Sequence, residues 1–466
     1  MGLRSAISSA RGRRLRLLAA LLPLALAACG GGGGHAGGAP GDVLPPASCS
    51  VSDQQSWLAD YMNEWYFWYR LAPHPAPAGY VSLGAYFNAL LYTGADASFP
   101  ADRWSGYEST ASFNRFYGDG ATLGYGVAVA GLEALADPAL PLYVRHVDPL
   151  SDAGVQGVQR GDQVLSLNGT PAATLIANND FSLLVADREQ QQLTLRLRRN
   201  GIDRTVVVSA KVFALTPVAG AAVYLSQGGR RIGYVAVEDM ISQAQSGIDA
   251  AFASFRSQGV QDAVLDLRYN GGGLVSTGAG LASYVGGNPV AGSTYATLLY
   301  NDKLAGRYNQ SFPFASPSPL NALALRRVFV LTGARTCSAS EQLINGLRGA
   351  GISVVTVGDT TCGKPVGFLP ADGQCGTTYS VVNFESVNAL NQGRYFDGFD
   401  ATCAVAEDFT VAQGAPTDPL VATAAYYADT GRCAPMAAMR TTVREGVPAV
   451  VRRAWQSDQR SDMLGR

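Results

Sequence analysis

From residue 213 onward, short apolar runs alternate with amphipathic stretches, and this alternation constrains the fold more than any other feature of the chain. Four runs have the length and composition of buried strands, namely 232–237, 263–268, 327–332 and 352–357. Three stretches have helical periodicity, namely 242–257, 280–285 and 338–347. Strands that alternate with helices predict an α/β core with a largely parallel sheet across residues 213–430.

Two regions with other patterns precede this core. Within residues 51–116, Trp57, Tyr61, Trp65 and Tyr69 recur at every fourth position, which indicates one face of a helix and which we interpret as packing. Residues 117–212 contain short β runs with Asn-Gly turns, which is typical of a small β-rich domain. We therefore predict a multidomain α/β protein with a helical domain at 51–116, a β-rich domain at 117–212, the α/β core and a C-terminal tail at 431–466.

Residues 1–28 have the features of a signal peptide. Several arginines precede an apolar stretch at 17–28 that is too short to span a bilayer with ease. The stretch ends in Leu26-Ala27-Ala28-Cys29, which resembles the bacterial lipobox and implies lipidation of Cys29. An ordinary signal peptide followed by a chance cysteine is the alternative. In residues 29–50 a glycine-rich run follows Cys29, and we expect this segment to form a flexible linker.

These features predict an exported protein that a lipid anchors on the periplasmic side of the cell envelope. Gly30 stands where an aspartate is associated with retention in the inner membrane of enteric bacteria, so the outer membrane is favoured. The net charge of −1 argues against nucleic acid or an anionic lipid surface as the main partner. Membrane contact is therefore expected only through the lipid anchor.

Six cysteines follow Cys29 along the chain. They are Cys49, Cys337, Cys362, Cys375, Cys403 and Cys433. An even number in an exported protein indicates disulfides, and the sequence leaves their pairing open. No pair has CxxC spacing and histidine is scarce, so we predict neither a metal site nor a cofactor.

Ser338 and Lys364 form the pair that is most informative about chemistry. The chain has only three lysines and three histidines, against 32 arginines. Arginine does not give up its proton at neutral pH, whereas a desolvated lysine can become a base. Because a serine hydroxyl needs an adjacent base to act as a nucleophile, we expect Lys364 to be buried with a lowered pKa. Cys337 is a poor alternative nucleophile, since no histidine lies near it in sequence.

Both residues follow predicted strands, and functional residues of such sheets gather at the carboxyl ends of strands. Ser338 lies at the start of a predicted helix, whose free N–H groups suit a developing oxyanion. A third strand leads into Gly271-Gly272-Gly273, where the backbone can approach a substrate closely. Each feature alone also has a structural interpretation: a capping box of Ser338 with Glu341, a surface lysine and a turn.

In combination, three segments resemble motifs of the C-terminal processing (tail-specific) peptidases. Residues 266–273 (DLRYNGGG) match the strand-to-glycine motif, residues 338–341 (SASE) the nucleophile motif, and residues 358–364 (GDTTCGK) the segment with the general-base lysine. The resemblance covers most of residues 50–430. It implies a crotonase-like core and a Ser–Lys hydrolase of peptide bonds.

The resemblance also implies roles for individual residues. Ser338 would be the nucleophile and Lys364 the general base, with an oxyanion hole formed by the N–H groups of Ala339 and of Gly271 or Gly272.

Two features depart from the family pattern. Many members have a glutamine four residues after the lysine, and here that position is Phe368. Glu341 and Ser340 are therefore the candidates for a third catalytic member. Cys337 and Cys362 flank the catalytic pair, and a disulfide between them could brace the site or gate it by redox state.

Within the β-rich region, residues 161–169 resemble PDZ domains, which bind peptide C-termini by strand addition. The carboxylate-binding loop would comprise Leu123, Gly124, Tyr125, Gly126 and Val127. The alternative is a small β-barrel without a ligand.

Together these features predict an exported serine endopeptidase that acts on protein or peptide substrates with free C-termini. The competing hypothesis is a catalytically degenerate, peptide-binding lipoprotein on a peptidase scaffold. The sequence leaves the physiological substrate, the cleavage-site preference and the oligomeric state open.

Overall fold

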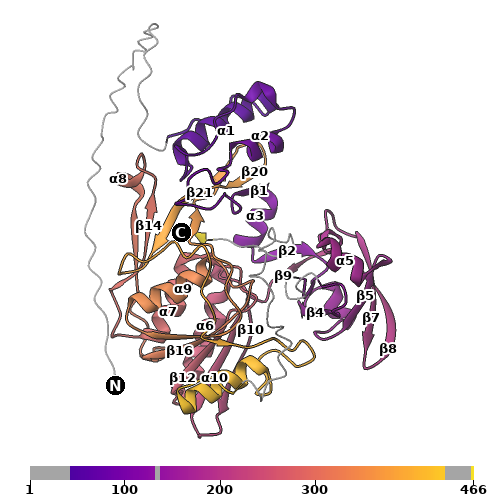
Figure 1. The fold of residues 1–466 in the computed structure, drawn as a ribbon, viewed down its shortest axis with the longest axis vertical. Helices are drawn as coiled ribbons and strands as arrows, with labels where there is room; N and C mark the ends of the chain where they lie inside the picture. Colours follow the sequence, from indigo (N-terminus) through magenta and orange to yellow (C-terminus); the bar gives the residue numbers. More distant parts are fainter. Residues whose placement is uncertain (1–41, 132–136, 436–462, 466) are drawn as a thin grey trace, which may run out of the picture. The chain divides into compact units, whose positions relative to one another are not determined.

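The computed structural model describes residues 42–131, 137–435 and 463–465. It has a mixed α/β architecture with several sheets (Figure 1). The predicted signal peptide, Cys29 and the glycine run of the linker lie outside the described residues. None of the helices within the described ranges is long and apolar enough to cross a membrane.

The predicted parallel sheet is present in the α/β core. Its described strands lie in the order β10, β11, β12, β16, β17 and β22, and only the β10–β11 pair is antiparallel. Their bounds are Val218–Leu225, Arg231–Val237, Asp262–Asp266, Arg327–Thr332, Ser353–Gly358 and Cys403–Ala404. All residues of β12 are buried, as expected for a strand covered on both faces.

Helices cover both faces of this sheet (Figure 1). Leu265 and Val330 face the cluster formed with α6, α7 and α9, whereas their neighbours Val264 and Phe329 face α10. The helices are α6 (Gln245–Ser257), α7 (Val275–Gly286), α9 (Ala339–Gly349) and α10 (Pro419–Thr430). Helix α7 begins earlier than the predicted 280–285, because its first turn is made of Val275 followed by the small or polar residues Ser276, Thr277 and Gly278, which carry no apolar helical period.

The described residues form a second sheet of six strands, and buried residues of this sheet share a hydrophobic cluster with the first. Its order is β13 (Gly273–Leu274), β23 (Met463–Leu464), β18 (Val366–Phe368), β21 (Val382–Val387), β14 (Thr294–Tyr300) and β15 (Gln310–Pro313). A short helix, α8 (Ala305–Tyr308), connects β14 to β15. This sheet was not predicted from the sequence. Its described strands β13, β23 and β18 have only two or three residues each and are too short to carry a periodic pattern.

The N-terminal helices share a hydrophobic cluster with the α/β core. These elements are α1 (Val51–Trp65), a short 3-10 turn (Pro77–Gly79), α2 (Leu83–Leu90) and α3 (Thr110–Tyr117). Strand β1 (Gly106–Ser109) joins a small sheet with β20 (Thr377–Ser380) and β19 (Ala371–Asp372). Trp57, Tyr61 and Trp65 of α1 are buried in the common cluster, which confirms packing for these three. Tyr69 was predicted on the same helix face, but α1 ends at Trp65, and Tyr69 is only partly buried against the cluster.

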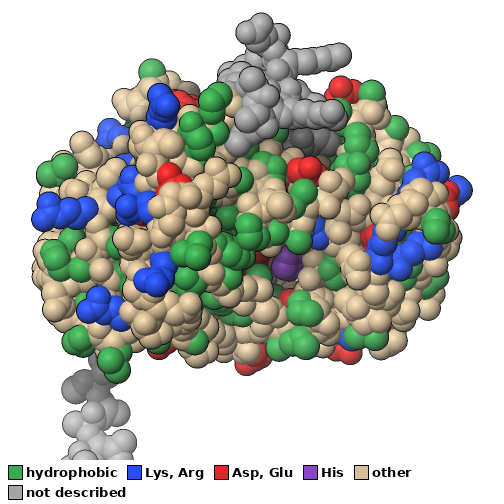
Figure 2. All heavy atoms as spheres, turned by 90° about the horizontal axis from the view of Figure 1, so that it is seen from below, with side chains coloured by type: hydrophobic (Ala, Val, Ile, Leu, Met, Phe, Trp, Pro, Cys, Tyr) green, Lys and Arg blue, Asp and Glu red, His purple; other side chains and the backbone are tan. Residues whose placement is uncertain are grey.

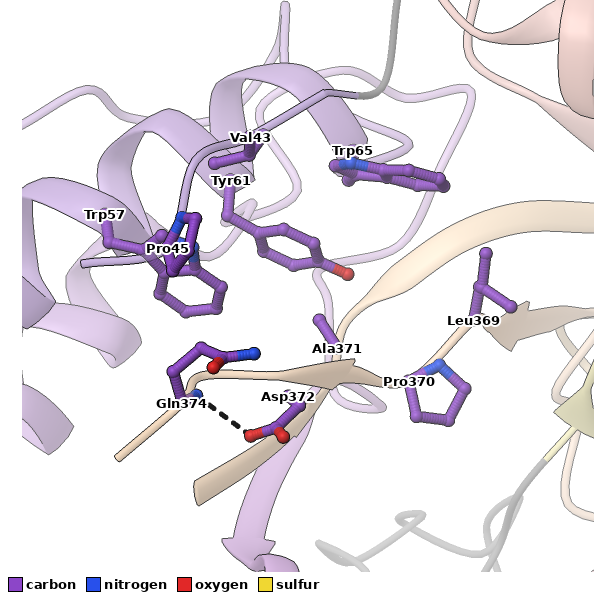
Figure 3. A pocket seen from close by; sticks show the side chains of 10 residues that line it. All are labelled: Val43, Pro45, Trp57, Tyr61, Trp65, Leu369, Pro370, Ala371, Asp372 and Gln374. Atoms are coloured by element: carbon purple, nitrogen blue, oxygen red, sulfur yellow. Dashed lines mark hydrogen bonds between the residues drawn. The ribbon is translucent and has the colours of Figure 1, made fainter. Parts of the chain in front are cut away.

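The same aromatic stripe borders a cavity of about 250 Å³. Figure 3 shows the rings of Trp57, Tyr61 and Trp65 opposite the segment that carries Pro370 and Asp372. Trp57 stacks on Tyr61 with ring centroids 5.3 Å apart. No candidate catalytic residue lines this cavity, so the cavity is separate from the predicted site.

Residues 117–212 are β-rich, as predicted, and have a hydrophobic cluster of their own. Strand β2 (Ala121–Gly124) pairs with β9 (Lys211–Ala214). The larger sheet comprises β3 (Val127–Val129), β4 (Leu142–Val147), β5 (Gln163–Leu167), β6 (Thr170–Pro171), β7 (Gln192–Arg199) and β8 (Ile202–Ser209). Helices α4 (Asp152–Val155) and α5 (Ala172–Asn178) pack with it. Strand β3 lies at the edge of this sheet.

Three disulfides connect the six cysteines. They join Cys49 to Cys375, Cys337 to Cys362, and Cys403 to Cys433. The predicted use of all six cysteines in disulfides is therefore confirmed. The second of these bonds lies beside the candidate catalytic residues.

Charged side chains of both signs are interspersed on the face shown in Figure 2, and neither sign covers it. This distribution agrees with the formal net charge of −1.

Candidate active site

Ser338 lies where the loop after β16 enters α9. It is the N-cap residue of α9, with φ 63° and ψ −116°, and a positive φ is uncommon outside glycine. The residue is fully buried, and its Oγ has no hydrogen-bond partner among the described residues. A buried hydroxyl without a partner costs free energy. Such a hydroxyl is therefore a candidate for a chemical role.

Ser340, two residues further on, has a different environment. Its Oγ donates to Asn270 Oδ1 at 2.8 Å and lies 3.1 Å from the carbonyl oxygen of the same residue. The Ser340 hydroxyl thus fixes the loop that follows β12. This arrangement favours Ser338 over Ser340 as the nucleophile.

Glu341 connects the serine loop to the lysine loop. Its carboxylate accepts hydrogen bonds from the backbone N–H groups of Ser338 (2.9 Å), Gly363 (2.8 Å) and Lys364 (2.8 Å), and from Thr361 Oγ1 (2.5 Å). Burial raises the pKa of Glu341, and these hydrogen bonds act in the opposite direction. The capping-box arrangement of Ser338 and Glu341 is present, yet it leaves the serine hydroxyl without a directed hydrogen bond.

Lys364 is fully buried, as the sequence predicted. Its Nζ lies 4.0 Å from the centroid of the Phe368 ring. Phe368 belongs to β18 and is 1% exposed. The residue at the position of the family glutamine therefore contacts the lysine through an aromatic face, which attracts a cation, rather than through an amide.

The disulfide between Cys337 and Cys362 brings the two loops together covalently. The Cα atoms of these cysteines lie 5.1 Å apart. The Cys362 N–H also donates to the Thr336 carbonyl at 3.0 Å. The Glu341 carboxylate lies within 4.8 Å of both sulfurs, but sulfurs bonded to each other are not thiolate ligands for a metal.

The glycine loop after β12 completes the candidate site. The Cys337 N–H donates to the Asn270 carbonyl at 3.1 Å, so this loop lies against the serine loop. The Gly272 N–H donates to Asn270 Oδ1 at 2.8 Å. In the described part of the chain, the N–H groups of Gly271 and Ala339 donate to no other group. The backbone N–H groups of Gly271 and Ala339 are therefore available to bind an oxyanion, whereas the N–H group of Gly272 is not.

A buried charge cluster anchors the start of the glycine loop. Arg268 is 2% exposed and lies 2.9 Å from Asp266, 2.7 Å from Asp418 and 3.2 Å from Glu407. Removing one partner of a buried ion pair is strongly destabilising, because the other charge stays buried. The cluster therefore fixes the chain just before Asn270 and Gly271.

Comparisons with known proteins agree with this geometry. Peptidase family S41 matches residues 231–392, and the Peptidase S41 N-terminal domain matches residues 53–106. These two segments of the chain are similar to peptidase family S41. The matched S41 segment contains Gly271, Ser338, Glu341 and Lys364.

Curated relatives of the chain include carboxyl-terminal-processing enzymes. The carboxyl-terminal-processing protease of Picosynechococcus sp. is 26% identical over 217 residues, which cover 46% of this chain and 49% of that protein. The chloroplastic carboxyl-terminal-processing peptidase 1 of Arabidopsis thaliana is 27% identical over 218 residues, which cover 46% and 42%. The chain thus spans about half the length of the curated relatives that it matches.

A solved structure shows the same S41 fold. The putative S41 protease from Bacteroides fragilis superposes with a TM-score of 0.63 at 24% sequence identity, and the match covers 80% of this chain and 97% of that one. At this identity, the comparison supports the fold alone.

The sequence predicts which loops form the candidate site but not how they connect. Glu341 was proposed as a third catalytic member; in the structure its carboxylate contacts the backbone of both loops. The disulfide between Cys337 and Cys362 was one of several pairings that the sequence allowed. Such contacts leave no local signal in the sequence, because the two loops follow separate strands, β16 and β17, and meet only when these strands pair in the sheet.

We predict that Glu341→Gln lowers the rate of peptide hydrolysis by about tenfold or more. An amide cannot accept hydrogen bonds from all four donors, and its NH₂ group would face N–H groups of the backbone. Burial raises the pKa of Glu341, so this carboxylate should take up a proton at a higher pH than an exposed one. On acidification, the parent should therefore begin to lose activity at a higher pH than it would if the carboxylate were exposed. Rate–pH profiles of the parent and the variant test both effects. Equal profiles would remove Glu341 from its positioning role.

Proposed function

We propose that the protein is an exported serine endopeptidase in which Ser338 is the nucleophile and Lys364 is the general base. The observation that carries this proposal is the buried, unpartnered Ser338 Oγ at the start of α9, in a loop that Glu341 connects to the buried Lys364. The match of residues 231–392 to peptidase family S41 supports the same class of reaction.

The proposed reaction proceeds through an acyl-enzyme. Lys364 Nζ in its neutral form takes the proton of Ser338 Oγ as this oxygen attacks the carbonyl carbon of the peptide bond. The free N–H groups of Ala339 and Gly271 stabilise the negative charge that develops on the carbonyl oxygen. The lysine then gives the proton to the leaving amine, and water hydrolyses the ester by the reverse sequence of proton transfers.

Substrates are proposed to be proteins or peptides that the PDZ-like region at 117–212 selects by their free C-termini. Strand β3 is an edge strand and offers unpaired backbone groups for strand addition. It follows the loop Tyr125–Gly126, in which Gly126 has a φ of 74° and a Cβ would lie 1.8 Å from Ser151. Glycine is therefore required at this turn. A crotonase-like core and lipid anchoring at Cys29 belong to the same proposal.

A peptide titration tests this substrate selection. The full chain with Ser338→Ala, which avoids cleavage, should bind a peptide that ends in Val, Ala or Leu as the free acid. It should bind the amidated peptide at least about tenfold more weakly, since amidation removes a charge that accepts hydrogen bonds. Calorimetric titration of both peptides measures the difference. Equal affinities would place substrate selection outside the loop at 123–127.

Hydrolysis itself is tested with an unstructured protein such as casein. The full chain should release peptides, and the Ser338→Ala variant should not. A full chain that binds peptides without cleaving casein would favour the competing hypothesis of a degenerate peptidase scaffold.

A further inference from the structure

Strand β23 is a short segment that fills a slot between two strands of the catalytic region. Met463 and Leu464 pair in parallel with Gly273 and Leu274 of β13, and Leu464 also pairs in parallel with Phe368 of β18. The Gly465 N–H donates to the Phe368 carbonyl at 3.2 Å. The segment 463–465 thus joins β13 and β18, which do not pair with each other.

The two strands that border this slot are direct continuations of the catalytic loops. Strand β13 begins two residues after Gly271, and β18 begins two residues after Lys364. A backbone that lies between β13 and β18 is therefore flanked by the proposed oxyanion loop on one side and by the lysine loop on the other. An extended backbone in this slot would therefore run between the two loops that are proposed to act on a substrate.

The slot fits its occupant closely. Met463 is 0% and Leu464 is 1% exposed. A Cβ on Gly367 would lie 2.5 Å from the Met463 carbonyl oxygen, and a Cβ on Gly465 would lie 2.9 Å from Leu298. The slot therefore takes two consecutive apolar side chains followed by a residue without a side chain.

We propose that the slot between β13 and β18 is the acceptor site for the substrate backbone, and that Met463–Gly465 occupy this site and inhibit the peptidase. The ligand class is an extended peptide with two apolar residues followed by glycine. The inference rests on the proposed peptidase function, which it deepens by naming the substrate-binding strand.

Strand addition explains why the slot needs an occupant. An empty slot would leave the facing N–H and C=O groups of β13 and β18 unpaired in a buried setting, which is costly. A segment of the same chain is present at a high effective concentration and competes with substrates in solution. Activity should therefore be low until a substrate displaces residues 463–465.

Two point variants of the full chain test the proposal. Leu464→Asp places a charge in the apolar slot, and Gly465→Pro removes the N–H that bonds Phe368. Leu320→Asp is the matched control, because Leu320 is 75% exposed and receives the same chemical change. We expect both slot variants to hydrolyse casein at least about fivefold faster than the parent, and the control to be unchanged.

A peptide added in trans completes the experiment. A synthetic peptide with the sequence of residues 459–466 should restore inhibition of Leu464→Asp, and the same peptide carrying Leu464→Asp should not. Slot variants that are folded but no faster than the parent, together with a peptide that does not inhibit, would overturn the proposal. Loss of the folded circular dichroism signal in both slot variants would also overturn it, since β23 would then be a structural strand.

The casein assay distinguishes a failure of the self-inhibition from a failure of the proposed peptidase function. If neither the parent nor any variant hydrolyses casein, the peptidase function fails. If all of them hydrolyse it equally, the function stands and the self-inhibition fails.

Discussion

Replacement of Ser338 by alanine is expected to reduce peptide hydrolysis by about a thousandfold or more while the protein stays folded. The substitution removes a hydroxyl that contributes no hydrogen bond to the described structure, so the free energy of unfolding should change little. Lys364→Ala should cause a loss of similar size, and the double variant should be no worse than either single one. A nucleophile and its base act as one unit, so their losses do not add.

Ser340→Ala is the control for this prediction. It removes the hydrogen bond to Asn270 and should lower stability by about 1 kcal/mol, with a smaller loss of activity than Ser338→Ala. Initial rates on casein and thermal unfolding curves of the four variants measure the effects. Substantial activity in Lys364→Ala would contradict the role of this lysine. An active Ser338→Ala with an inactive Ser340→Ala would show that the other serine is the nucleophile.

Loss of the disulfide between Cys337 and Cys362 is the second large expected effect. The double variant Cys337→Ser/Cys362→Ser should lose activity by about tenfold or more, because the bond holds the loop of Ser338 against the loop of Lys364. Stability should fall by about 3 kcal/mol on the loop-closure argument for a closed loop of this size.

The disulfide between Cys403 and Cys433 provides a matched control. Its sequence separation of 30 is close to the separation of 25 in the active-site bond, so its loss should cost similar stability. The variant Cys403→Ser/Cys433→Ser should nevertheless keep its activity at a temperature where both variants are folded. Equal activity losses in the two double variants would mean that the active-site disulfide acts only through stability.

Much of the α/β core could be predicted from the sequence. Buried strands such as β12 and β16 are continuous apolar runs, and their spacing implies helices between them. The carboxyl ends of these strands then indicated where Gly271, Ser338 and Lys364 would meet. Pattern and topology indicated which loops would lie together, whereas the roles proposed for these residues came from the resemblance to a peptidase family.

The remaining features depend on contacts between segments that are distant in the chain. The strands β13, β18 and β23 have two or three residues each, and their pairing leaves no periodic signal. The four hydrogen bonds to Glu341 and the contact between Lys364 and Phe368 likewise arise from the meeting of separate loops. The sequence supplied the residue types at these places but not their partners.

The measurement that tests the central claim most directly is covalent labelling of the full chain with a fluorophosphonate probe, followed by mapping of the adduct by mass spectrometry. We predict one adduct on Ser338, within the peptide 336–347, and markedly slower labelling in Lys364→Ala. An adduct on Ser340, or a labelling rate that is unchanged by Lys364→Ala, would contradict the account of a Ser338–Lys364 pair.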